Sequence, residues 1–308
     1  MNFDPKQVLL VALGAFTLFY LIAFARGMVL AKRQGTPDPQ NVTGTALTVA
    51  FIANFFDTLG IGSFATTTAA FRQFKMVRDE IIPGTLNVGY VLPTIAQAFI
   101  FTTVIPVDSL TLILMILAAV VGAWLGAGIV AGWPRQRIQV GMGIALLVAA
   151  AIMLYRTAIG DPTGSDAIGL RGALLAAGLV GNFVLGALMT LGIGLYAPCM
   201  ILVSMLGLNP GTAFPIMMGS CAFLMPVASA KFVEKRAFHP GVALSLAIGG
   251  IPAVLIASRL VQEMVNRYLW AVKYLVVVVV VYAAVGLLRT WRSERVPAGK
   301  QTVQAGAG

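Results

Sequence analysis

The sequence predicts an all-α polytopic membrane protein built from two inverted repeats, each a glycine-broken helical hairpin plus three transmembrane helices, with one extra N-terminal helix. Of the 308 residues, 59% are hydrophobic and only 10% are charged, and the mean hydropathy is +0.91. These values lie outside the range of ordinary soluble domains. Apolar runs long enough to cross about 30 Å of hydrocarbon recur along the chain. The pentapeptide Thr-Leu-Gly-Ile-Gly occurs at residues 58–62 and again at residues 190–194.

The repeated pentapeptide marks a break in each half. Two glycines cost a helix about 1 kcal/mol each relative to alanine, and backbone groups freed inside hydrocarbon need partners from protein or water. Such a cost indicates a functional site at each break. The repeat extends beyond the motif, because Pro83 and Pro93 have counterparts in Pro215 and Pro226 at nearly the same separation as the two motifs. We therefore predict two homologous repeats, at residues 42–158 and residues 166–290.

The extra helix precedes the repeats, within residues 1–35. An apolar run covers residues 7–25 and is followed by three cations at residues 26–33, whereas only Lys6 precedes it. Because no small-residue cleavage site is evident, the run predicts a retained spanning helix in place of a signal peptide. The positive-inside rule then puts the N-terminus outside and the end of the helix in the cytoplasm.

The first repeat opens with an apolar segment at residues 43–71 that contains the first Gly-Ile-Gly. A basic cluster at residues 72–78 follows it and another cluster precedes it, so both of its ends belong in the cytoplasm. We predict a hairpin of two helical arms with the glycines near its tip. Three spans follow, at residues 82–104, 109–131 and 138–158.

The second repeat copies this order with a hairpin at residues 172–206 and spans at residues 213–233, 240–258 and 270–289. A hairpin plus three spans makes an odd number of crossings, so the second repeat must lie inverted relative to the first. In this arrangement 15 of the 21 Lys and Arg residues are cytoplasmic, against 12 if each broken segment crosses the membrane once. The charge count does not separate re-entrant arms from fully spanning ones. Residues 291–308 predict a disordered cytoplasmic tail.

Polar residues and glycines gather around the two breaks and are the candidate substrate-binding residues. A helical arm that restarts after each Gly-Ile-Gly would direct its N–H groups and its positive dipole end at the tip, which makes an anion site without a buried cation. For the threonines, the alternative is that each hydroxyl bonds the backbone of its own helix. The candidates are Asn54, Asp57, Thr58, Gly60, Gly62, Ser63, Thr66 and Asn87 in the first half, and Thr190, Gly192, Gly194, Tyr196, Pro198 and Cys199 in the second. They are accompanied by Thr67, Thr68 and Asn182, and by Gln97, Ser220 and Ser229 on the spans after the hairpins.

Asp57 is the one acidic residue deep in an apolar segment. Intramembrane carboxylates are rare and usually functional. Because an ionised carboxylate would repel an anion, Asp57 could take up a proton together with its ligand. The structural alternative is a neutral or capping side chain that bonds nearby backbone groups.

The motifs of the common enzyme classes are missing from the sequence. It has no Walker loop, no HExxH and no CxxC, and its single histidine, His239, lies in a basic loop. Cys199 and Cys221 lie in apolar segments, so neither a disulfide framework nor a cysteine metal site is expected. We therefore expect no enzyme activity, no cofactor and no bound metal. The net charge of +10 comes from short clusters between apolar runs, which indicates topology determination and no nucleic-acid partner.

These features resemble the sulfite exporter TauE/SafE family, also called the toluene sulfonate uptake permease family. The similarity covers about residues 43–290, and its strongest matches are Leu-Gly-Ile-Gly at residues 59–62 and Leu-Gly-Ile-Gly-Leu-Tyr-Ala-Pro at residues 191–198. They look like the family's G-I-G-G-G and G-x-G-x-x-x-P stretches. The chain departs from the family pattern at Ser63, where glycine is usual, and at Ala65-Thr66, where Val-Pro is expected. The resemblance implies transport of sulfite, a sulfonate or another small organosulfur anion across a bacterial inner membrane.

Energetics favour export over import for such an anion. With the cell interior negative, each negative charge that leaves gains about 2.3 kcal/mol per 100 mV, so export can be a uniport whereas import needs a coupled ion such as a proton. The expected partners are a small anionic substrate, the lipid bilayer and, where transport is coupled, protons. A membrane-embedded accessory or sensor subunit without transport activity is the alternative, and the sequence leaves the oligomeric state open.

Overall fold

The computed structural model describes residues 5–34, 43–130, 135–158, 167–189 and 194–295. Within these ranges every regular element is a helix. Seven of the helices are long and apolar enough to cross a membrane. The predicted all-α polytopic fold is therefore confirmed.

The helices of the two halves follow one another in the same order. The chain starts with α1 (Pro5–Gln34). The first half then contains α2 (Gly44–Thr58), α3 (Ser63–Gln73), the 3-10 helix η1 (Asp79–Ile81), α4 (Ile82–Val104), α5 (Ser109–Val130) and α6 (Arg135–Ala158). The second half contains α7 (Gly172–Met189), α8 (Tyr196–Met205), the 3-10 helix η2 (Pro210–Thr212), α9 (Ala213–Glu234), α10 (Pro240–Arg267) and α11 (Leu269–Arg295). This order agrees with the predicted repeat, while the inverted orientation of the two repeats in a membrane stays a prediction.

The observed helices of the two repeats lie close to the predicted spans, and among them α10 differs most. It runs on to Arg267, well beyond the predicted end at residue 258. The added turns are polar, and within them Arg267 pairs with Glu263 at 2.9 Å one helical turn earlier. Such a pair supports a helix that continues past the hydrocarbon layer, where apolar content no longer marks its end.

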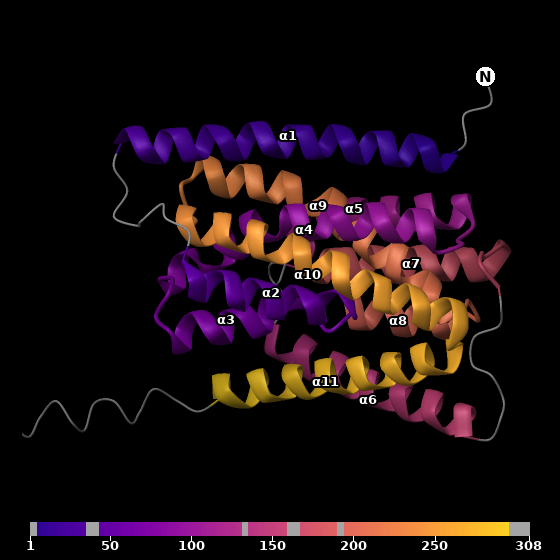
Figure 1. The fold of residues 1–308 in the computed structure, drawn as a ribbon. Helices are drawn as coiled ribbons and strands as arrows, with labels where there is room; N and C mark the ends of the chain where they lie inside the picture. The colour runs from indigo at the N-terminus through magenta and orange to yellow at the C-terminus, as the bar shows by residue number, and fades with distance from the viewer. Residues whose placement is uncertain (1–4, 35–42, 131–134, 159–166, 190–193, 296–308) are drawn as a thin grey trace, which may run out of the picture.

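The arms of the first hairpin are too short to cross a membrane. At 1.5 Å per residue, the 15 residues of α2 span about 22 Å and the 11 residues of α3 about 16 Å, against about 30 Å of hydrocarbon. In Figure 1, α2 and α3 lie together at the left of the bundle and α7 and α8 at the right, whereas α1 runs along its whole length. The hairpins thus enter the bundle from opposite ends.

The two halves exchange their hairpin helices. Helix α2 of the first half packs along α10 of the second, and its counterpart α7 packs along α5 of the first. Helices α4 and α9 pack against each other between these pairs, and α6 packs on α11. The first hairpin helix of each half therefore packs against a helix of the other half.

Small residues allow the exchanged helices to approach closely. A side chain at Gly122 of α5 would meet the backbone of Phe183 on α7, and one at Gly186 of α7 would meet the backbone of Ala119 on α5. The α2–α10 pair has the same character, because Gly249 of α10 lies against the backbone of Leu47. Close backbone approach of this kind is how helices associate in a membrane, where lipid competes equally for apolar side chains.

The turns between helices gather at two ends of the bundle. At one end, the turn before α5 meets the start of α7: Asp108 accepts two hydrogen bonds of 2.8 Å from the guanidinium of Arg171. At the other end, Gly27 of α1 lies against Val233 of α9, and Gly84 of α4 lies against Ala237 in the turn before α10. These contacts join the halves at both ends of the molecule.

Candidate functional site

The first Gly-Ile-Gly forms a tight reversal between α2 and α3. Gly60 and Gly62 have φ angles of 98° and 81°, a left-handed region that residues with a side chain rarely enter. The amides of Gly60 and Ile61 donate to the carbonyls of Asp57 and Phe56. The break therefore keeps part of its backbone hydrogen-bonded, and α3 restarts at Ser63.

Asp57 caps the restarting helix. It lies in the last turn of α2, is only 5% exposed, and its Oδ1 accepts a 2.6 Å hydrogen bond from the backbone N–H of Ser63. A carboxylate at this position satisfies an otherwise unpaired donor and faces the positive end of the α3 dipole. The structure thus contains the capping contact that the structural alternative for Asp57 requires.

Gln97 of α4 bridges the first hairpin and the second. Its Nε2 donates to Asp57 Oδ2 at 3.0 Å and to the Thr58 hydroxyl at 2.9 Å. Its Oε1 accepts from the hydroxyl of Tyr196, the first residue of α8, at 3.3 Å. One fully buried amide therefore connects the carboxylate of one hairpin with the tyrosine of the other.

The second tip is built differently from the first. Among the residues that the structure describes, no side chain caps the start of α8, where Tyr196 and Ala197 open the helix ahead of Pro198. Gly194 is exposed, and a side chain added there or at Gly62 would meet no atom within 4 Å. The tips approach each other at Gly60, where an added Cβ would lie 2.9 Å from the sulfur of Met200 on α8. There is thus room beside one glycine of each break, next to a point where the hairpins touch.

Three buried amides, those of Asn54, Gln139 and Asn182, keep an acceptor without a partner among the residues that the structure describes. Asn54 donates to the carbonyl of Ala50 and packs against Gly250 of α10, and its Oδ1 has no hydrogen-bond partner among the residues that the structure describes. Asn182 donates to the carbonyl of Met115 on α5, and its Oδ1 likewise has no hydrogen-bond partner among the described residues. Buried acceptors of this kind are unusual in a packed interior and mark places that a donor from water or a ligand could fill.

The structure brings together most of the residues predicted from the sequence. Asn54, Asp57, Thr58 and Ser63 are buried around the first tip with Gly60 and Gly62, and Tyr196, Pro198 and Cys199 are buried in the first turn of α8. Gly194 precedes that turn. Thr190 and Gly192 lie outside the described residues.

Three predicted residues have side chains that bond only the backbone of their own helix. Asn87 donates to the carbonyl of Pro83 and lies about 15 Å from Gln97 along α4, at 1.5 Å per residue. Thr66 donates to the carbonyl of Ser63, and Thr68 donates to the carbonyl of Phe64. These threonines follow the backbone-bonding alternative. Thr67 does not, because its hydroxyl pairs with that of Tyr90 on α4.

Gln97 is the residue whose importance the sequence understates. It appears there only as a possible lining residue on the span after the first hairpin. The available signal is a glutamine in an apolar segment four residues after Pro93, a position that faces the bundle interior if the segment is a buried helix. A long amide side chain inside hydrocarbon needs partners for its donors and its acceptor, and Asp57, Thr58 and Tyr196 supply them.

The chemistry available at this cluster is hydrogen bonding and proton exchange. No group of three or more His, Cys, Asp or Glu side chains that could hold a metal occurs in the part of the chain that the structure describes.

No protein-family model matches the sequence, and comparisons with curated proteins and with solved structures also found no match.

Proposed function

We propose that this multi-pass membrane protein is a transporter that moves a small sulfur oxyanion or sulfonate across a bacterial inner membrane. The observation that carries the proposal is the meeting of the two hairpins inside the bundle, where Gly60 lies against Met200 and Gln97 joins Asp57 to Tyr196. Paired broken helices that meet between two repeats are a recurrent way to build a transport site. The sulfur-anion class rests on the sequence resemblance at residues 59–62 and 191–198.

The substrate anion would bind at the start of α8. The first N–H of α3 already donates to Asp57, whereas no side chain from the described part of the chain caps α8, and its first turn carries the Tyr196 hydroxyl. Backbone N–H groups at a helix start, together with the dipole, favour a negative ligand. The space beside Gly194 and Gly62 gives such a ligand room to approach both tips.

Asp57 would then control the charge of the cluster. A bound anion beside Tyr196 is one amide away from the Asp57 carboxylate, so the two negative charges repel each other. A proton taken up with the anion removes this repulsion. The membrane potential drives an anion outward, which supports export, and a coupled proton would be needed only for import.

The distribution of cations supports a cytoplasmic location for the end of the bundle that holds the α3–α4 turn. Lys75 and Arg78 lie in that turn, and Lys235 and Arg236 lie in the α9–α10 turn, which meets the same end at Gly84. At the opposite end, Arg171 and Arg267 each pair with a carboxylate. Under the positive-inside rule, the N-terminus is then outside and the C-terminus cytoplasmic.

Flux through the purified protein in liposomes tests the proposal. Sulfite, a small sulfonate, sulfate and chloride would be compared at fixed potential, and we expect the sulfur anions to pass faster than chloride, with no flux in protein-free liposomes. The alternative is an accessory or sensor subunit, which would bind one of these anions without moving it. Absence of flux for the whole panel, together with retained binding, would therefore replace the proposed function with that alternative.

A further inference from the structure

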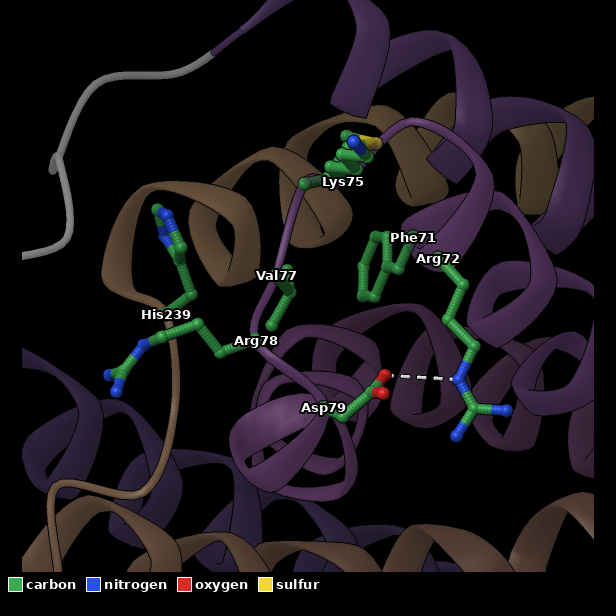
Figure 2. A pocket seen from close by; sticks show the side chains of 8 residues that line it. Phe71, Arg72, Lys75, Val77, Arg78, Asp79 and His239 are labelled. Atoms are coloured by element: carbon green, nitrogen blue, oxygen red, sulfur yellow. Dashed lines mark hydrogen bonds and ion pairs between the residues drawn. The ribbon is translucent and has the colours of Figure 1, made fainter. Parts of the chain in front are cut away.

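A second cavity lies away from the hairpin tips, at the end of the bundle where α3 stops. Its volume is about 680 Å³, within the range of small-molecule sites. The segment from Phe71 to Asp79, which runs from the end of α3 to the start of η1, forms most of its wall, and His239, in the turn before α10, completes it from the second half. Figure 2 shows His239 and Arg78 on one side of this cavity and Arg72 with Asp79 on the other.

The charged side chains that line the cavity are mostly cationic. Arg72, Lys75 and Arg78 carry positive charge, and Asp79 is the one carboxylate among its lining residues. Arg72 pairs with Asp79 at 3.0 Å, but both side chains are 64% exposed, and an exposed pair of this kind is weak enough to open for another anion. The balance of charge favours a negatively charged occupant.

His239 presents a hydrogen-bond donor from the other half. Its Nδ1 accepts from the backbone N–H of Val242 at 3.3 Å, as the cap of α10. With Nδ1 accepting, the neutral ring carries its proton on Nε2. The ring therefore lines the cavity with a neutral imidazole that carries its proton on Nε2.

The turn after α3 gives Lys75 an uncommon backbone conformation. Lys75 has a φ of 49°, a left-handed conformation that a residue with a side chain adopts at a cost. The same closure ends α8, where the N–H of Leu208 bonds the carbonyl of Val203, but there the left-handed residue is Gly207. Arg236 at the end of α9 has the same left-handed conformation without lining the cavity, so this conformation belongs to the helix end. What bears on binding is the place of Lys75 in the cavity wall.

We propose that this cavity binds the phosphate group of an anionic phospholipid. Arginine and lysine recognise phosphate oxygens, and basic pockets at the cytoplasmic ends of membrane helices take lipid headgroups. Phe74, the residue before Lys75, is 56% exposed and extends the apolar surface of α3 next to the cavity, where a lipid chain would lie. The inference does not depend on transport activity, since a sensor or accessory subunit could use the same lipid.

Binding of short-chain lipids to the purified protein in detergent tests the proposal. Dioctanoyl phosphatidylglycerol would be compared with dioctanoyl phosphatidylcholine, and inorganic phosphate would be added as a competitor. We expect the parent to prefer phosphatidylglycerol and Lys75→Gly to weaken its binding about fivefold, since a cation near the headgroup is worth about 1 kcal/mol. The Lys75→Gly variant should melt no lower than the parent, because glycine accepts the left-handed turn without strain.

Arg236→Gly is the matched control. Arg236 ends α9 in the same left-handed conformation, at φ 53°, and is not one of the residues that line the cavity. Removing it changes the net charge equally and should leave lipid binding unchanged, whereas Arg78→Gln should weaken it as Lys75→Gly does. Equal losses in Lys75→Gly and Arg236→Gly, or no preference for phosphatidylglycerol in the parent, would overturn the proposal. Inorganic phosphate in large excess should displace the lipid, because both present the same group, whereas displacement by equimolar phosphate would assign the site to soluble phosphate.

Discussion

Asp57, Gln97 and Tyr196 form a chain of contacts across the interior. Asp57 accepts from Ser63 and from Gln97, and Gln97 accepts in turn from Tyr196. Since all of these groups are buried, a change in the charge of the carboxylate alters the strength of every bond in the chain. Protonation of Asp57 at one hairpin tip would therefore change the hydrogen bond that Tyr196 makes at the other.

Substitution of Asp57 by asparagine separates its possible roles. If the carboxylate takes up a proton with the anion, flux should rise as the pH falls in the parent, and Asp57→Asn should keep the flux but lose this dependence, because asparagine mimics the neutral acid. If its charge rejects ordinary anions, the variant should instead pass chloride at fixed pH. The measurement is liposome flux of sulfite and chloride at several pH values. A parental pH profile together with parental selectivity would leave Asp57 only its capping role.

The Asp108 carboxyl provides a pH-dependent contact outside the membrane-spanning segments. Hydrogen bonds from the Arg171 guanidinium hold its pKa well below the usual range, and the backbone and hydroxyl of Thr111 add to this effect. Because the folded-state pKa is lowered, the stabilisation is fully present above the unfolded value of about 3.9 and is lost as the pH falls through the folded value.

We expect Asp108→Asn to melt below the parent at pH 7 and the difference between them to shrink below about pH 4. Asparagine can still cap α5 through Thr111, whereas Asp108→Ala also loses this cap, at a further cost of about 1 kcal/mol. Thermal unfolding across pH measures both effects. Glu263→Gln, which breaks the exposed pair with Arg267, is the control and should change little. If the difference in melting temperature between Asp108→Asn and the parent is constant from pH 7 to pH 3, the stabilisation does not come from the charge of the Asp108 carboxylate.

At the scale of elements, the two hairpin tips differ in backbone conformation. Gly62 has a positive φ, so a β-branched residue there is strained by about 1–2 kcal/mol, whereas Gly194 is not among the glycines with positive φ. Both have open space beside them. A comparison of variants at Gly62 and Gly194 can therefore separate the effect of blocking the binding site from the effect of backbone strain.

Valine at either glycine should abolish sulfite binding, but with different effects on stability. Gly62→Val should lower the melting temperature, whereas Gly194→Val should fold nearly as the parent does and fail only in binding, since its bulk fills the space that the anion needs. Gly14→Val in α1, another position with open space around it, is the control for added bulk. Unchanged sulfite affinity in Gly194→Val would remove the second tip from the site.

The sequence predicted the helices well because apolar runs, basic clusters and two glycine breaks are local signals. The cap from Asp57 to Ser63 is also nearly local, because it closes over the two glycines between them. The bond between Gln97 and Tyr196 was out of reach, because it joins distant residues and depends on how the two halves pack. The contact of Asn54 with Gly250 could not be foreseen for the same reason, since it follows from the exchange of α2 onto α10.

At the scale of the whole molecule, the two hairpins enter from opposite ends of the bundle (Figure 1). We expect single cysteines at Lys75 and Asn209 to react with impermeant reagents from opposite sides of the membrane, Lys75 from the cytoplasm and Asn209 from outside. Cys199 and Cys221 would be replaced first, although both are buried. Labelling of intact cells and of inverted vesicles decides the matter. Equal access to both positions from one side would exclude the inverted arrangement.

The exchange of hairpin helices also constrains the order in which the protein can be made. Helix α2 leaves the ribosome long before α10, yet Ala46, Ala50 and Asn54 are fully buried in the finished structure, in which α2 packs along α10. Until α10 is synthesised, this face has only lipid or the translocation machinery to contact, and the amide of Asn54 makes that exposure costly. Nascent first halves should therefore be held by the insertion machinery or degraded, and co-expressed halves should protect each other from proteolysis.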